Sequence, residues 1–226
     1  VMNNIKLKFN RFYNLIFGEK FYKKLDFNWD NLPKRYDLIN KVIMKKNYKS
    51  YLEIGCDQNQ TFDNISIDKK VGVDPIQGGN LKKTSDLFFS ENKEKFDCIF
   101  IDGLHTYEQV RKDVYNSLNV LNDNGTIFIH DCLPKGFFYQ AVPRSRSIWN
   151  GDVWKIIVEY RSKKDLDTCT CFIDQGVGII KKRKNSNLFV NDIKNFKNLK
   201  FKYFYYNYKT LMNIIEYKDI NDFLEI

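Results

Sequence analysis

Both histidines of this 226-residue chain follow an apolar segment that ends in or beside an acid. One nearly continuous apolar run precedes Asp102 and His105, and a second one precedes His130 and Asp131. An imidazole exchanges protons near neutral pH, and a carboxylate can orient it or bind a cation. The pattern therefore predicts proton transfer or metal binding at the ends of two strands.

Two further acids fall in or after apolar segments. Glu53 precedes Gly55, and Asp74 lies 19 residues beyond that glycine. In dinucleotide-binding folds, a carboxylate at such a position accepts hydrogen bonds from ribose hydroxyls. The full glycine-rich diphosphate loop is absent, because Asp57 and Asn59 stand where glycines would be needed. These residues favour a nucleoside ligand and argue against a dehydrogenase.

The elements that must position these residues alternate between strands and helices. A hairpin closes the series around Gln175 and Gly176. Alternation of this kind predicts an α/β fold: a Rossmann-like, doubly wound, mostly parallel sheet with an antiparallel edge strand and helices on both faces. The predicted parallel strands are residues 51–54, 70–73, 96–101 and 125–131. Their carboxyl ends would meet along one cleft.

Two helix starts are predicted near this cleft. Ser85 and Asp86 can cap a short helix, because their side chains can accept hydrogen bonds from free backbone N–H groups. Thr106 and Gln109 have the spacing of a capping box at the start of a longer helix.

We divide the chain into three segments. Residues 1–30 form a basic and aromatic helical extension, residues 31–182 the main domain, and residues 183–226 a basic and aromatic C-terminal extension. The first extension can lie on the domain or on a membrane surface, and docking on the core is the expectation. Peripheral membrane contact and homo-oligomerisation both stay open.

The net charge of +9 is concentrated in one part of the chain. Residues 181–202 carry eight basic residues against Asp192, which leaves little net charge for the remainder. A local basic surface can meet an acidic polymer, a nucleotide-linked substrate or an anionic membrane. A solvated basic face is the plainer interpretation, so no nucleic-acid partner is expected.

Five cysteines, an odd number with no C-x-x-C pair, favour small core residues in a reducing, cytoplasmic setting. No apolar run approaches the ~18 residues of a spanning helix, so no transmembrane segment is expected.

Several of these segments together resemble the class I S-adenosylmethionine-dependent methyltransferases. More narrowly, they are similar to a bacterial group with an IDG-x-H-x-Y-E signature, often associated with sugar modification and surface-polysaccharide biosynthesis. The segments are YLEIGC (51–56), VGVDP (71–75), FDCIFIDGLHTYEQV (96–110), GTIFIHDCLP (125–134) and WNGDVWK (149–155). The resemblance covers roughly residues 30–182.

The resemblance implies that S-adenosylmethionine is the cofactor. Glu53 and Gly55 would then lie under its methionine and ribose part, and Asp74 would hold the ribose diol. Ser85 and Asp86 would lie beside the adenine. Asp102 would stand near the sulfonium. Asp57 and Asn59 depart from the family's glycine loop, and the link before Asp86 is short.

The same resemblance implies a catalytic role for His105, since similar sugar O-methyltransferases use a histidine at this position as the general base. Asp102 would orient the ring and favour its protonated form. Some relatives bind Mg²⁺ at these strand ends, and Asp102, His130 and Asp131 would be the ligands here. His130 supplies a nitrogen where Mg²⁺ prefers oxygen.

The acceptor would be a small molecule or a saccharide, bound by aromatic and charged side chains. Aromatic faces suit sugar C–H surfaces and arginines suit phosphates. The residues predicted to wall this side are Tyr107, Arg144, Trp149, Asp152 and Trp154. The predicted function is O-methylation of a carbohydrate or nucleotide-linked sugar. The alternatives are methylation of RNA or another small molecule, and a non-catalytic module that binds S-adenosylmethionine.

Overall fold

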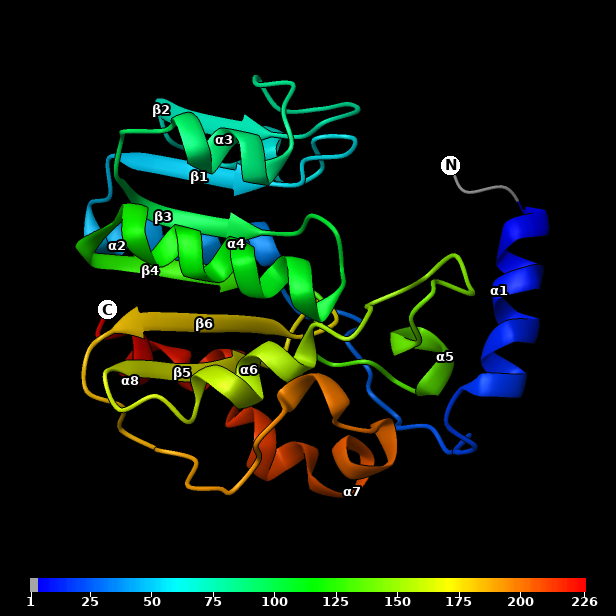
Figure 1. Cartoon of the computed structure of the whole chain (residues 1–226). Helices are drawn as coiled ribbons and strands as arrows, with labels where there is room; N and C mark the ends of the chain where they lie inside the picture. Colours follow the sequence, from blue (N-terminus) through cyan, green and yellow to red (C-terminus); the bar gives the residue numbers. More distant parts are fainter. Residues whose placement is uncertain (1–3) are drawn as a thin grey trace.

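A computed structural model describes residues 4–226 of the chain, and seven of its strands form a single sheet. The spatial order is β2-β1-β3-β4-β6-β5-β7 (Figure 1). The strands are β1 (Ser50–Ile54), β2 (Lys69–Val73), β3 (Phe96–Ile101), β4 (Leu121–Ile129), β5 (Leu166–Cys171), β6 (Val177–Lys182) and β7 (Ile214–Ile215).

The sheet is mostly parallel. β1 pairs in parallel with β2 and β3, and β3 pairs in parallel with β4. β6 runs antiparallel to both of its neighbours, β4 and β5, and short β7 pairs in parallel with β5 at the edge. The predicted fold class, a mixed and mostly parallel Rossmann-like sheet, is confirmed. The hairpin inserts its antiparallel strand between β4 and β5.

Helices cover both faces of this sheet, which makes two apolar cores. On one face, α4, α6 and α7 pack their apolar side chains against the sheet, and on the other face α2 and α8 do so (Figure 1). The helices are α1 (Asn4–Phe17), α2 (Arg35–Lys46), α3 (Ser85–Glu91), α4 (Tyr107–Val120), α5 (Phe137–Gln140), α6 (Trp154–Tyr160), α7 (Phe201–Met212) and α8 (Ile220–Leu224), with short 3₁₀ turns at Phe62–Asn64, Phe196–Asn198 and Tyr217–Asp219.

The C-terminal segment contributes to both cores. Phe201 and Phe204 of α7 are fully buried on one face, and Ile220 and Leu224 of α8 are fully buried on the other. All five cysteines are free and buried, which confirms their interpretation as core residues. Across residues 4–226, none of the helices has the length and apolarity needed to cross a bilayer.

Register brings the carboxyl ends of the central strands level with one another. Ile54 pairs with Ile101, and Ile101 pairs with Ile129, so three strands end side by side. Backbone hydrogen bonds continue one step beyond them, from Asp102 N–H to the carbonyl of Ile54 and from His130 N–H to that of Ile101. The acids that follow these strands therefore gather at one place, as the sequence predicts.

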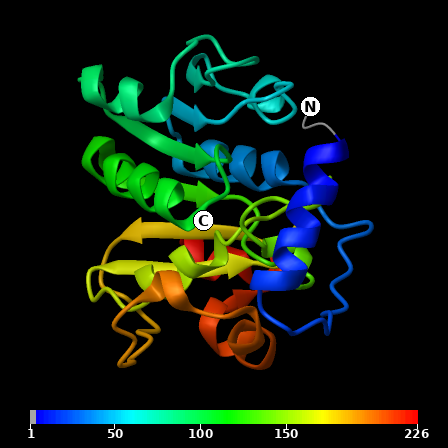
Figure 2. The same ribbon diagram turned by 45° about the vertical axis from the view of Figure 1, so that its right-hand side comes forward.

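Helix α1 lies beyond this carboxyl edge, beside the loop that follows β4 (Figure 2). It is held there by two asparagines. Asn10 donates to the carbonyl of Arg144 at 2.7 Å, and Asn14 donates to the carbonyl of Pro143 at 2.8 Å. The helix thus docks through its polar side.

The helix caps differ from the predicted ones. Thr106 makes no side-chain cap at the start of α4, and the Gln109 amide turns instead to Ser85, Asp86 and Asp113. Asp152, far along the chain, takes the capping role by accepting from the Tyr107 N–H at 2.7 Å. For α3 the cap is Thr84, whose hydroxyl accepts from the Leu87 N–H. A tertiary contact has replaced the local capping box of α4.

The basic segment 181–202 is partly neutralised within the fold. Lys181 and Arg183 both pair with Glu225, and Arg183 also pairs with Asp167. Lys197 pairs with Glu108. These ion pairs favour the interpretation as a charged but internally compensated face.

Candidate active site

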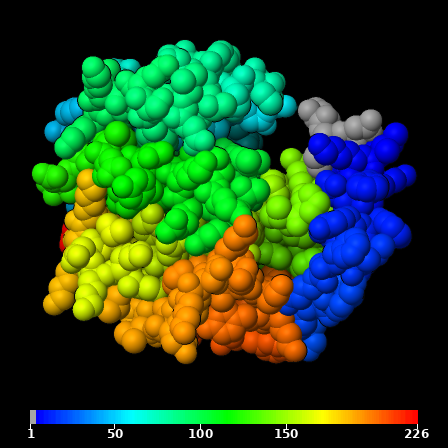
Figure 3. Space-filling model, viewed as in Figure 1, coloured from blue at the N-terminus to red at the C-terminus, as the bar shows by residue number. Residues whose placement is uncertain are grey.

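A cavity of about 940 Å³ lies over the carboxyl edge of β1, β2 and β3. Figure 3 shows the surface hollowed between blue α1 and the cyan-to-green half of the sheet. Its volume lies within the usual range for small-molecule sites, roughly 300–1,000 Å³. Its walls include Gly55, Asp74, Asp102, His105 and Trp149. The predicted nucleoside side and the predicted base thus face the same space.

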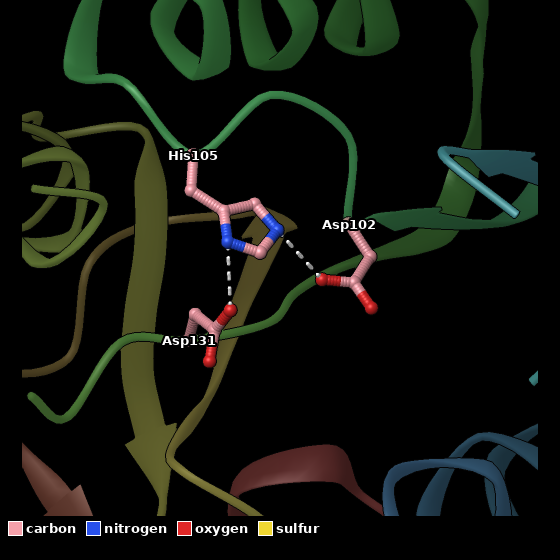
Figure 4. A group of neighbouring side chains, drawn as sticks. All are labelled: Asp102, His105 and Asp131. Carbon is pink, nitrogen blue, oxygen red and sulfur yellow. Dashed lines mark ion pairs between the residues drawn. The ribbon is translucent and has the colours of Figure 1, made fainter. Parts of the chain in front are cut away.

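At the floor of the cavity, His105 lies between two carboxylates (Figure 4). Its Nε2 is 3.2 Å from Asp102 Oδ1, and its Nδ1 is 2.9 Å from Asp131 Oδ2. Nδ1 is also 3.0 Å from the carbonyl oxygen of Trp149. Both neighbours of Nδ1 only accept hydrogen bonds, so Nδ1 carries a proton. Nε2 is then the atom that can exchange one.

The carboxylates control the protonation of this ring. Burial alone would lower the pKa of His105, but the charge of Asp131 and the hydrogen bond to Asp102 outweigh burial and raise it well above its ordinary value. For Asp102, burial acts to raise the pKa, yet the charge of His130 and the hydrogen bond from His105 hold it well below its usual range. In the free protein, His105 is therefore an imidazolium that must lose a proton before it can act as a base.

His130 lies beneath this cluster, not within it. Its Nδ1 is 3.1 Å from Asp102 Oδ1, and its Nε2 is 2.8 Å from the carbonyl oxygen of Asp174. Although burial lowers the pKa of His130, Asp102 and Asp131 raise it to about 10. His130 is buried and does not line the cavity, and its Nε2 is against a backbone carbonyl, so it is not placed to bind a metal there. Among the described residues, the group that could hold a metal is Asp102, His105 and Asp131, with ligand atoms within 4.8 Å of one another. The geometry replaces His130 of the predicted set with His105.

Asp131 is held by a special backbone conformation. Its φ of +64° lies in the left-handed region, which costs a non-glycine residue of order 1 kcal/mol or more. The Asn150 amide donates to Asp131 Oδ1 at 2.7 Å, which leaves Oδ2 for His105. Asn150 is therefore a positioning residue for the carboxylate.

Two residues of the cluster have no signal in the sequence. Arg35, the first residue of α2, donates to Asp174 Oδ2 at 2.9 Å, and its Nε lies 3.8 Å from Asp102 Oδ2. Asp174 comes from the turn between β5 and β6, and the neighbouring charges hold its pKa below its usual range against the effect of burial. Neither stands at the end of a predicted parallel strand, although Asp174 ends the predicted first strand of the hairpin, and no local spacing distinguishes them.

Asp74 organises the loops at the nucleoside end. Its Oδ2 accepts from the N–H groups of Cys56 and Asp57, each at 3.1 Å, and its Oδ1 accepts from those of Ile76 and Gln77 at 2.8 and 3.0 Å. Burial raises the pKa of Asp74, but these four backbone donors outweigh it and lower the pKa. A ribose diol would have to share or replace these hydrogen bonds.

Glu53 does not line the cavity. It lies in the core of β1 with 1% of its surface exposed and accepts from the Tyr51 hydroxyl at 2.5 Å. Burial raises its pKa to about 8, although the Tyr51 hydrogen bond acts to lower it. Its carboxylate therefore lies in the core below the strand end, and not among the residues that line the cavity.

The predicted adenine end contains one more acid. Ser85 and Asp86 line the cavity, and so does Asp113 of α4. Gln109 donates to Asp113 Oδ1 at 3.1 Å, whereas Oδ2 is buried and has no hydrogen-bond partner in the described part of the chain. Burial raises the pKa of Asp113 to about 6. Asp113 was not predicted as a site residue, and its one signal in the sequence is an acid among the apolar residues that α4 buries.

The predicted acceptor wall is only partly present. Arg144 and Trp149 line the cavity, and the Trp149 ring stacks on His105 at 5.6 Å between centroids. The other three predicted residues are buried elsewhere: the Tyr107 hydroxyl donates to Glu159, Asp152 caps α4 and binds Lys155, and Trp154 donates to Gln140. Their side chains join α4 to α6 and α6 to α5, and none of the three lines the cavity.

Comparison with known proteins agrees with this fold. Residues 54–132, about a third of the chain, match the family model of a methyltransferase domain. This segment runs from the end of β1 to the residues just after β4, so it contains most of the cavity-lining strand ends. No curated protein matches the chain.

Solved structures with a similar fold include a candidate O-methyltransferase from Klebsiella pneumoniae, with a TM-score of 0.51, 11% identity, and coverage of 81% of this chain and 90% of that one. An S-adenosylhomocysteine-bound methyltransferase from Podospora anserina has a TM-score of 0.49 and 15% identity over 66% and 78% of the two chains. An O-methyltransferase from Bacillus cereus, also in complex with S-adenosylhomocysteine, has a TM-score of 0.48 and 14% identity over 80% and 93%.

The raised pKa of Glu53 makes a prediction about stability. Between about pH 4.5 and 8 the folded protein keeps the proton that the unfolded chain loses, so the free energy of unfolding falls as pH rises through this window. Glu53→Gln removes that dependence. From about pH 5 to about pH 8, the variant should gain roughly 2–4 kcal/mol relative to wild type. Urea denaturation across this range measures the difference, and exposed Asp123→Asn is the control. Parallel pH profiles for wild type and Glu53→Gln would contradict the assignment.

Gly151 makes a second prediction, because it packs directly on the backbone of His105. Its φ is +60°, and an added Cβ would overlap the His105 carbonyl. Gly151→Ala should therefore destabilise the fold by about 1–3 kcal/mol and displace the imidazole. Gly136→Ala is the matched control, since its backbone is extended and its nearest neighbour is a flexible lysine side chain. Thermal unfolding and the His105 NMR signals measure both effects. An unchanged imidazole environment in Gly151→Ala would contradict the prediction.

Proposed function

We propose that this protein transfers a methyl group from S-adenosylmethionine to a hydroxyl of a carbohydrate or nucleotide-linked sugar. The observation that carries the proposal is the arrangement of one cavity: acids at its nucleoside end, and an imidazole between two carboxylates at its floor. Within the cell, this activity fits surface-polysaccharide biosynthesis on the cytoplasmic side.

The cavity residues suit a sulfonium nucleoside. Gly55, with a φ of +86°, lets the backbone of β1 approach Asp102 and Gly103 closely, and leaves room for a ligand above it. Asp113, which lines the cavity, supplies a carboxylate that could accept from an exocyclic amine such as that of adenine. Asp102 supplies negative charge where the sulfonium would lie. When bound, S-adenosylmethionine supplies an electrophilic methyl group.

His105 takes the proton of the incoming hydroxyl in this proposal. With S-adenosylmethionine bound, its methyl group would pass to the acceptor oxygen and S-adenosylhomocysteine would be left, while Nε2 of His105 would take the hydroxyl proton. Asp131 and the Trp149 carbonyl fix Nδ1, so Nε2 keeps its direction. Because the pKa of His105 is raised, its neutral form is a strong base, but little of the protein contains that form at neutral pH. The reaction should therefore accelerate as pH rises.

Arg144 and Trp149 supply the acceptor contacts. The Trp149 ring presents an aromatic face beside His105, which suits the C–H face of a pyranose. Arg144 lies 5.7 Å from that ring and can meet a sugar phosphate. The pairing of an aromatic face with a guanidinium favours a nucleotide-linked or phosphorylated sugar.

The same three groups can bind a divalent metal, which is the second role that the geometry allows. Two carboxylates and an imidazole suit a cation that tolerates nitrogen, such as Mn²⁺ or Zn²⁺, better than Mg²⁺. A metal would lower the pKa of a bound hydroxyl. In that case Asp102, His105 and Asp131 would hold the ion.

Ligand binding tests the proposed cofactor. Titration calorimetry should detect S-adenosylhomocysteine binding, and Asp102→Asn and Asp113→Asn should weaken S-adenosylmethionine binding by roughly ten-fold each through lost charge and hydrogen bonding. Asp63→Asn, an exposed acid away from the cavity, should leave it unchanged. Methylation of a panel of nucleotide sugars then identifies the acceptor. Failure to bind either nucleoside would refute the proposal.

His105 separates the two chemical roles. As a general base, His105→Ala should lower kcat by about 10²–10⁴-fold with little change in cofactor affinity. Wild-type activity should survive exhaustive EDTA treatment. If EDTA abolishes activity and Mn²⁺ restores it, the cluster is a metal site and His105 is a ligand. Turnover of His105→Ala near that of wild type would remove the residue from the mechanism.

A further inference from the structure

Helix α1 is oriented with its polar side inward. Its buried residues are Asn10 and Asn14, which donate hydrogen bonds to the loop after β4, and Arg11 lies over the Phe138 ring at 4.4 Å. These contacts fix the rotation of the helix about its axis. An amphipathic helix of a globular protein normally buries the opposite, apolar side.

The apolar side of α1 therefore faces outward. Positions 9, 12, 13 and 16 have the spacing of one helical face. Their side chains and the adjoining one at position 17 are between 43% and 71% exposed: Phe9, Phe12, Tyr13, Ile16 and Phe17. In Figure 3, the blue α1 forms one margin of the molecule. Such a continuous exposed apolar surface indicates an interaction site.

The charges around the apolar side of α1 indicate which kind of surface it can bind. Lys6 lies on the apolar face, three and seven residues before Phe9 and Tyr13, and Lys8 lies beside that face. Both lysines are exposed, and neither takes part in an ion pair among the described residues. No acid occurs between Asn4 and Phe17. Glu19 follows the helix, but its carboxylate accepts from the N–H groups of Phe201 and Lys202. The exposed face is thus apolar, with a lysine at its N-terminal end and another along one border.

We propose that α1 is an interfacial helix that docks the protein on an anionic lipid surface. Phenylalanines on one face, with lysines at its borders, are the composition of helices that lie in the plane of a membrane. The apolar side chains would enter the acyl boundary, and the lysine stems would reach outward to lipid phosphates.

A second copy of this chain fits the face less well. In a helix pair, the lysines beside one apolar stripe would meet those beside the other, with no acid on either helix to compensate them. The net charge of +9 adds long-range repulsion between copies. Anionic headgroups satisfy the same lysines.

Docking of this kind goes beyond the proposed function and has a geometric consequence. Asn4 and Leu7 of the same helix line the cavity over the carboxyl edge. The docked helix would therefore hold the cavity beside the lipid surface.

Vesicle co-sedimentation tests the proposal with the full chain. The protein should sediment with vesicles of equal parts phosphatidylcholine and phosphatidylglycerol, and remain in solution with phosphatidylcholine alone. Phe9→Gln/Phe12→Gln/Phe17→Gln should lower partitioning at least about 100-fold. Lys6→Gln/Lys8→Gln should lower it by about five-fold for each lysine, and high salt should mimic this loss.

The control makes the same kind of substitution at exposed apolar residues outside α1. Met44 and Val190 are 70% and 83% exposed but lie outside α1, so Met44→Gln/Val190→Gln should sediment like wild type. Thermal unfolding should show all variants folded, because every replaced side chain is exposed. The assay contains no nucleoside, so its outcome is independent of the proposed methyl transfer.

Three results would overturn the proposal. In the first, the wild type remains in solution with both kinds of vesicle, and in the second, the triple phenylalanine variant sediments with vesicles like the wild type. In the third, the wild type is a dimer, the triple variant is a monomer, and neither binds lipid. The last would assign the face to a second copy, as measured by sedimentation velocity.

Discussion

The need to pair charges below a cavity constrains the centre of this protein. Three carboxylates, Asp102, Asp131 and Asp174, face two imidazoles and the guanidinium of Arg35. Removing one partner from such a cluster leaves a buried charge uncompensated, which typically costs about 3–5 kcal/mol. The cluster is therefore stable only as a unit. Its members come from α2, the ends of β3 and β4, and the β5–β6 turn, so the active-site floor and the fold are specified together.

The same pairing determines the chemistry. A histidine between two carboxylates is protonated in the free protein and can act in two ways once the proton leaves: as a strong base or as a metal ligand. His130 lacks this choice, since it is buried, does not line the cavity, and has its Nε2 against the carbonyl oxygen of Asp174. Two histidines at equivalent strand ends thus have different roles because one faces the cavity and the other lies beneath it.

The sequence predicts the strand ends well and the lateral contacts poorly. Period and apolarity are local, so β1 to β4 and the acids that follow them could be predicted. Arg35 and Asp174 reach the site only through packing of α2 and insertion of β6, and no local pattern carries that information. Tyr107 and Asp152 stand beside cavity residues in sequence, yet their side chains turn to Glu159 and to the start of α4. Their positions in the sequence placed Tyr107 and Asp152 near the cavity, but did not indicate the direction in which their side chains point.

Helix α1 shows the same distinction at the level of a whole element. Its basic and aromatic residues predict a helix that docks on the core, with a membrane surface as the alternative, but not which of its sides faces inward. The deciding contacts are two asparagine amides on backbone carbonyls of the 143–144 segment, which no periodicity encodes. One of these carbonyls belongs to Arg144, a cavity residue. A surface that binds the apolar side of α1 would therefore also be connected, through the Asn10–Arg144 hydrogen bond, to the cavity wall that contains Arg144. Binding at the helix can then affect the geometry of that wall.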